Sequence, residues 1–266
     1  MVDFLKWGGP LIVASLALAQ PWLLALWRRL FRQGTIDTHE TGNIEVGFSG
    51  YGATIGLNGT LRAVHQDQFV SNIRLSLVKL KDSSRHLLDW GVFRSQKVST
   101  AGSQEQSIEL PAGFMLTTPQ PQRFSIQFFD IALQDDMKPQ IEAVLGGWQA
   151  AVADADIAGL LELGLDATAI TQRVDEVYRQ FSENSVHVSA YTALDRLCYW
   201  EAGQYSLEMQ VSTARPDARF TRKWQFELTD QDANNVRSNS LKIVQDACGR
   251  TYGQYLFAYA PYGEAW

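Results

Sequence analysis

The sequence predicts a mainly β fold with a helical insertion, an N-terminal transmembrane helix and a C-terminal helix. From residue 43 to about residue 130, short stretches alternate apolar and polar side chains and are rich in β-branched and aromatic residues, as strands are. Residues 137–185 are instead rich in Ala, Leu, Glu and Gln, with apolar side chains at helical spacing. Before both regions, residues 8–27 contain no charged side chain.

This uncharged stretch is long enough to cross a bilayer, since twenty helical residues span roughly 30 Å. Tryptophans flank it and arginines follow it directly. Aromatic rings favour the headgroup region, and positive charges stay on the cytoplasmic side. We therefore expect a single-pass protein whose main domain is cytoplasmic. The residues assigned to the membrane anchor are Trp7, Pro21, Trp22, Trp27, Arg28, Arg29 and Arg32.

Two alternatives to a spanning helix remain open. Residues 17–20 read Ala-Leu-Ala-Gln, a small-x-small pattern typical of signal-peptide cleavage, which would place the domain in the periplasm or outside the cell. Alternatively, Pro21 divides the stretch, and the residues after it form an interfacial helix whose arginines face headgroups.

The region after the anchor divides by composition and by helix-capping signals. Asp166 precedes one helical stretch, and Thr229, followed by Asp232 three residues later, precedes another that ends near Gly249. Two strands are expected between these helices, at residues 205–211 and 220–228. The predicted segments are an anchor at 1–32, a linker at 33–42, a β domain at 43–228 interrupted by helices at 137–185, a helix at 229–249 and an aromatic tail at 250–266.

The stretch YWEAGQYSLEMQV contains a Glu-x-Gly-x-Tyr pattern formed by Glu201, Gly203 and Tyr205. This pattern resembles the tyrosine corner of immunoglobulin-like β-sandwiches, in which the hydroxyl bonds to backbone a few residues upstream. Leu207 stands where antibody domains have a cysteine. The resemblance therefore implies a disulfide-free, fibronectin-III-like sandwich, and the alternative is an ordinary turn before an ordinary strand.

Composition and motifs exclude several functions. The net charge of −6 argues against non-specific nucleic-acid binding, which needs a basic surface. Two cysteines, Cys198 and Cys248, are too few for a disulfide framework, and four scattered histidines show no zinc-ligand spacing. We find no catalytic, cofactor or metal motif in the sequence, so it favours a protein that is not an enzyme and has no cofactor.

Two regions are candidates for binding a partner. Arg219, Arg222 and Lys223 lie among aromatic residues, which suits contact with a partner or with anionic lipid; a solvated hairpin is the alternative. The tail carries Tyr255, Phe257, Tyr259 and Trp266 and is expected either to cover this domain's own core or to dock on a partner.

These observations favour a membrane-anchored binding or scaffolding subunit of a membrane-associated assembly, with the lipid bilayer and other protein subunits as partners. One alternative is a membrane-tethered enzyme with its site between the sandwich and the inserted helices. The other is a secreted or periplasmic binding module, if the first segment is cleaved.

Overall fold

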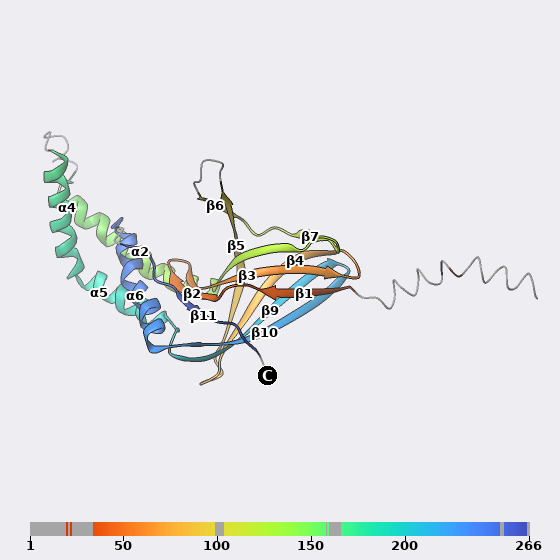
Figure 1. The fold of residues 1–266 in the computed structure, drawn as a ribbon. Coiled ribbons are helices and arrows are strands. Elements are labelled where there is room, and N and C mark those ends of the chain that lie inside the picture. Colours follow the sequence, from red (N-terminus) through yellow and green to blue (C-terminus); the bar gives the residue numbers. More distant parts are fainter. Residues whose placement is uncertain are drawn as a thin grey trace, which may run out of the picture.

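The computed structural model describes residues 34–98, 104–157, 159, 166–250 and 253–264, together with residues 20 and 22 (Figure 1). Twelve strands and four helices follow one another in these ranges. In chain order they are β1 (Thr35–Glu40), β2 (Ile44–Ser49), β3 (Gly52–Val64), β4 (Gln68–Lys79), β5 (Arg85–Val98), β6 (Gln104–Glu109), β7 (Phe114–Leu116), β8 (Gln122–Phe129), α2 (Ile131–Asp154), α4 (Ala167–Ser182), α5 (Ser185–Leu197), β9 (Gly203–Arg215), β10 (Asp217–Leu228), α6 (Asp230–Ala247), β11 (Ala258–Ala260) and β12 (Gly263–Glu264).

All twelve strands belong to one antiparallel sheet in the order β11-β2-β3-β8-β5-β4-β9-β10-β12, with β1 paired to β3, β6 to β5 and β7 to β4. The β-rich prediction is confirmed. The expected immunoglobulin-like division into two sheets is corrected, because the described strands form a single hydrogen-bonded sheet. The corner pattern could not reveal this, since it reports a contact within a few residues and strand order depends on pairings far apart in the chain.

The predicted fold class is also wrong in its transmembrane helix. None of the helices in the described part of the chain is both long and apolar enough to cross a membrane. Of the residues assigned to the anchor, Trp22 is described and its side chain is exposed. The others, Trp7, Pro21, Trp27, Arg28, Arg29 and Arg32, lie outside the described residues.

The polar stretch predicted as a linker contains β1, which together with β2 follows one edge of β3. Glu40 pairs with Gly59, whereas Glu45 pairs with Gly56. Between these two pairs the β1–β2 segment advances by five residues, whereas β3 advances by three. The two extra residues form a bulge around Gly42, whose φ is 74°. Side chains of β1 alternate between exposed and half-buried. Because only its inner face is partly covered, β1 has too few apolar residues to be recognised from composition.

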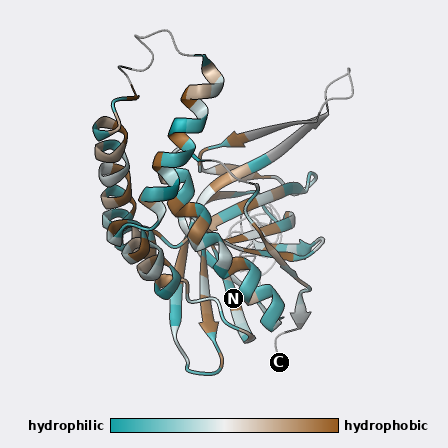
Figure 2. Cartoon of the chain, turned by 90° about the vertical axis from the view of Figure 1, so that its left-hand side faces the viewer, coloured by the Kyte–Doolittle hydropathy of each residue, from teal (hydrophilic) through white to brown (hydrophobic). Residues whose placement is uncertain are grey.

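The helices gather at one end of the sheet (Figures 1 and 2). Helices α2, α4 and α5 lie between β8 and β9 in the chain, and α6 follows β10. Predicted caps are confirmed: Asp166 accepts a hydrogen bond from the Ala169 amide, and Thr229 forms a capping box with Asp232. Trp148 on α2 packs against Tyr178 and Phe181 on α4, so these aromatic rings hold the two helices together.

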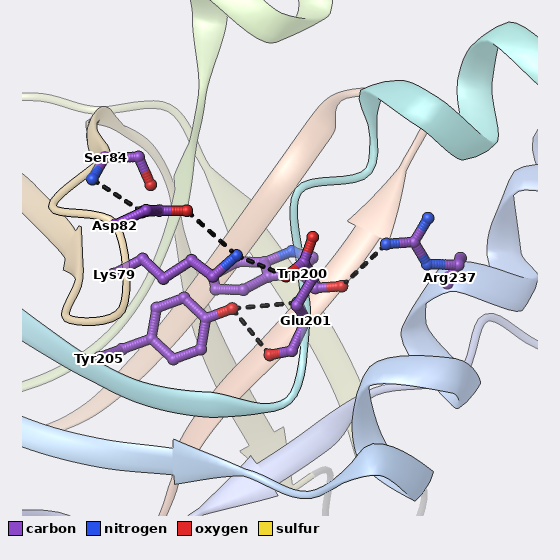
Figure 3. A network of polar contacts seen from close by, with 7 residues as sticks. All are labelled: Lys79, Asp82, Ser84, Trp200, Glu201, Tyr205 and Arg237. Carbon is purple, nitrogen blue, oxygen red and sulfur yellow. Dashed lines mark hydrogen bonds and ion pairs between the residues drawn. The ribbon is translucent and has the colours of Figure 1, made fainter.

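The predicted tyrosine corner is confirmed as a contact. The Tyr205 hydroxyl donates to the Glu201 carbonyl oxygen at 2.8 Å and accepts from the Glu201 amide at 3.0 Å (Figure 3). The Glu201 carboxylate forms an ion pair with the nearly buried Lys79 at 2.6 Å. This network fixes the entry into β9 against the end of β4.

The C-terminal segment covers this domain's own core and joins two edges of the sheet. Its strand β11 pairs with β2, and β12 pairs with β10 at Trp224 and Gln225. The segment is also fastened to α6, because the buried Asn239 side chain bonds to both the carbonyl oxygen and the amide of Leu256, at 2.8 and 2.9 Å. Residues 253–264 therefore act as a strap across the sheet edges, and we call them the C-terminal strap.

Candidate functional site

A groove of about 480 Å³ lies between β1 and β10, two strands more than 170 residues apart in sequence. A volume of this order is typical of sites that hold a small molecule or part of a peptide. We call this site the β1–β10 groove. Its lining comprises Ile36, Asp37, Thr38, His39 and Glu40 of β1, Met209 and Val211 of β9, and Phe220, Thr221 and Arg222 of β10.

The two strands that border the groove expose backbone along their facing edges. Over its full length β10 pairs with β9, but its other edge pairs with β12 only at Trp224 and Gln225. Within the described residues, β1 pairs with β3 and with no second strand. Unpaired amides and carbonyls at such edges can accept another strand.

The floor of the groove is apolar. Met209 and Val211 are 1% and 2% exposed, and the half-buried Ile36 and Phe220 pack against the same core. Met209 and Val211 are therefore already covered, and Ile36 and Phe220 are the apolar side chains that a ligand can contact, with polar residues of β1 and β10 around them.

A polar contact closes one end of the groove. The Glu40 carboxylate accepts hydrogen bonds from Arg222 Nε at 2.9 Å and Trp224 Nε1 at 2.7 Å. Tyr262 of the C-terminal strap packs edge-on against Trp224. Burial raises the pKa of Glu40, but hydrogen bonds, including those from Arg222 and Trp224, outweigh it and leave this pKa below its ordinary value. Glu40 is therefore ionised at neutral pH and holds β1 against β10.

One of the three predicted partner-binding residues on β10 lies in this groove. Arg222 lines it, whereas Arg219 lies exposed on the same strand and Lys223 forms an ion pair with Glu208 of β9 at 2.9 Å. The hairpin predicted from alternation is present, with β9 and β10 paired throughout. Binding by these residues stays a prediction.

The predicted residues of the tail do not converge on one site. Tyr255 donates a hydrogen bond to Asp246 of α6 at 2.6 Å. Phe257 lies against Gly47, where an added Cβ would come within 2.6 Å of its ring. Tyr259 is 60% exposed, and Trp266 lies outside the described residues. Tyr255 and Phe257 are thus engaged within this domain.

A second polar cluster lies where the sheet meets the helices. His86 of β5 stacks on Tyr199, with ring centroids 3.7 Å apart, and its Nδ1 lies 3.6 Å from the carboxylate of Asp130. Asp130 also caps α2 through the Leu133 amide. Burial raises the pKa of Asp130, but contacts with His86 and the Leu133 amide outweigh it, and its pKa is lowered. This cluster ties three elements together.

The two cysteines and the possible metal ligands of the described residues are groups with known site chemistry. Burial raises the pKa of both Cys198 and Cys248 to about 11, so these thiols stay protonated at neutral pH and are poor nucleophiles. Across the described ranges, no three His, Cys, Asp or Glu residues are grouped so that they could hold a metal ion.

No family model and no curated protein sequence matches the chain. A function for this protein is therefore argued from its structure.

The β1–β10 groove was not predicted from the sequence. The available signal was the alternation of Ile36, Thr38 and Glu40, which indicates a strand with one partly buried face.

Proposed function

We propose that this chain is a binding subunit of a protein assembly and that it holds its partner in the β1–β10 groove. The observation that carries the proposal is the groove itself, an apolar floor between two strand edges with unpaired backbone. Strand edges of this kind are sites of association between chains. Contact with a lipid bilayer and a cytoplasmic location stay predictions, because they rest on residues before position 34.

A binding role also agrees with the chemistry of the groove. Its one close ion pair, Glu40 with Arg222, joins two strands at the closed end. The floor is formed by apolar side chains of β1, β9 and β10. A partner strand would gain affinity from backbone hydrogen bonds to the two edges, and the partly exposed Ile36 and Phe220 would add apolar contact at about 25 cal/mol per Å² buried.

Site-directed photo-crosslinking in cells tests this proposal. A benzoylphenylalanine residue is placed at Thr221, which lines the groove. The matched control position is Glu227, which is exposed on the same strand but lies outside the groove. We expect a discrete protein adduct from position 221 and none from position 227.

The adduct must also depend on the groove. The half-buried Thr38 lines the groove, so the substitution Thr38→Trp fills it and is expected to abolish the adduct, whereas Glu227→Trp leaves it intact. The proposal is overturned if positions 221 and 227 yield the same adducts, if neither yields any, or if Thr38→Trp changes nothing while thermal unfolding shows the variant to be folded.

A further inference from the structure

We infer that the occupant of the β1–β10 groove is an extended segment of a partner protein, which joins the sheet as a strand antiparallel to both β1 and β10. This inference rests on the proposed function and specifies the chemistry of the partner. Strand direction, the C-terminal strap, the shape of the floor and the closed end of the groove each support it.

Strand direction permits this addition on both sides at once. Every pair along β1-β3-β8-β5-β4-β9-β10 is antiparallel. These are seven strands, so the first and the last run the same way. Two strands of the same direction cannot pair antiparallel with each other, but one strand of opposite direction pairs antiparallel with both.

The C-terminal strap already makes this addition at the adjacent part of the same gap. It pairs antiparallel with β2 through Ala258–Ala260 and antiparallel with β10 through Gly263 and Glu264. Because β2 follows β1 along the edge of β3, the strap and the groove occupy successive parts of one gap. The strap shows that an extended chain pairs antiparallel with each of these edges in turn, through three residues at β2 and two at β10.

The walls of the groove fit a strand with alternating side chains. Ile36, Thr38 and Glu40 are the half-buried residues of β1, and Thr35, Asp37 and His39 are its exposed ones. A segment in register with β1 would direct every second side chain towards Ile36 and Phe220, the partly exposed apolar residues of the lining. Six residues at about 3.3 Å each give a contact length of roughly 20 Å.

The closed end sets where the added strand stops. Glu40 and Arg222 meet across the gap at 2.9 Å, and Glu40 also accepts from Trp224, so side chains of β1 and β10 already fill this end of the groove. The added segment therefore lies along β1 from its start to the Glu40–Arg222 pair, beside Phe220 and Thr221 of β10. We expect five or six residues to pair, a length of about 17–20 Å.

A phage-displayed library of random peptides of about eight residues, selected against the full chain, provides the probe. We expect the selected peptides to carry apolar residues at every second position, and their affinities are measured by fluorescence anisotropy. Single N-methylation along the best peptide then tests strand pairing, because a methylated amide cannot donate. A strand paired on both sides donates its amides alternately to β1 and to β10, so we expect losses of about tenfold or more at each central position and much smaller losses at the two ends of the peptide.

Two variants separate this inference from the proposed function. Binding should be lost in Thr38→Trp and retained in Glu227→Trp, with circular dichroism confirming the fold of both. If the peptides bind in the groove but N-methylation of central positions costs little, or costs only at alternate positions as pairing with a single edge would, the two-sided strand mode is overturned and the binding role stands. If no selected peptide discriminates Thr38→Trp from the wild type while the crosslinked adduct is obtained, the inference also fails. Absence of both the adduct and groove-dependent peptides overturns both proposals.

Discussion

The attachment of the C-terminal strap to α6 makes a measurable prediction for Asn239→Ala. Asn239 is 2% exposed, and its side chain donates to the Leu256 carbonyl oxygen and accepts from the Leu256 amide. The substitution removes both hydrogen bonds, which contribute about 0.5–1.5 kcal/mol each, and leaves two backbone groups without partners. Because Leu256 is 47% exposed, water replaces part of this loss.

We therefore expect the free energy of strap opening to fall by about 2–4 kcal/mol, since the unpaired groups add to the two lost bonds. Each 1.4 kcal/mol is tenfold in an equilibrium constant, so the open population should rise by about 30-fold to 700-fold. Hydrogen–deuterium exchange of a peptide that covers β11 measures this opening directly. Asn239→Asp keeps the acceptor but sets a buried carboxylate oxygen against the Leu256 carbonyl oxygen, so at neutral pH it should open the strap at least as much as Asn239→Ala.

The matched control is Asn234→Ala, an exposed position on the same helix, which should leave exchange in β11 unchanged. Urea unfolding of all three variants separates local release of the strap from global loss of stability. The reasoning is refuted if Asn239→Ala unfolds like the wild type and the amides of β11 exchange at the wild-type rate.

Three further predictions follow from buried polar groups. Tyr205→Phe removes both hydrogen bonds to the Glu201 backbone, so it should lower the free energy of unfolding, measured in urea, by about 1–3 kcal/mol. The same change at the exposed Tyr191 should have little effect. Equal losses at the two positions would contradict a stabilising role for the Tyr205 contact. The pKa of Asp130 in the folded protein is lowered from 3.8. The stability that Asp130 contributes is therefore fully present above about pH 3.8 and is lost as the pH falls through the pKa of the folded state. Asp130→Asn should reduce the loss of unfolding free energy at acid pH, and an unchanged pH dependence would contradict this. Burial raises the pKa of Cys198 and Cys248 to about 11, so neither thiol should react with a disulfide reagent at about pH 8 until the chain unfolds; rapid labelling of the native chain would show that they are accessible.

Local structure was predictable from local sequence. The start of α6 follows from the Thr229 side chain and Asp232, which form the capping box within four residues. The Tyr205 contact likewise spans four residues. In both cases the residues that make the structure lie next to one another in the chain, so their pattern predicts the geometry.

The sheet order was not predictable in the same way. Long-range pairings such as β4 with β9 join residues more than 120 positions apart, and apolar alternation fits several partners equally well. The corner pattern led to a two-sheet expectation because it is a local contact that a single curved sheet can also contain.

The groove was hidden for a related reason. Its lining joins residues 36–40 to residues 209–222, and neither stretch carries a motif that points to the other. Arg222 was identified from its aromatic surroundings, but its partner Glu40 lies in the stretch expected to be a linker. The groove forms only when the folded sheet brings β1 close to β10.

The position of the C-terminal strap has a consequence for biosynthesis. Of the described elements, β11 and β12 leave the ribosome last, yet they cover edges of β2 and β10 that are made earlier. During translation, β2 therefore emerges long before its edge can be covered, and exposed edges invite association between nascent chains. A chaperone that shields this edge would be most valuable to this protein in the interval before residue 258 emerges.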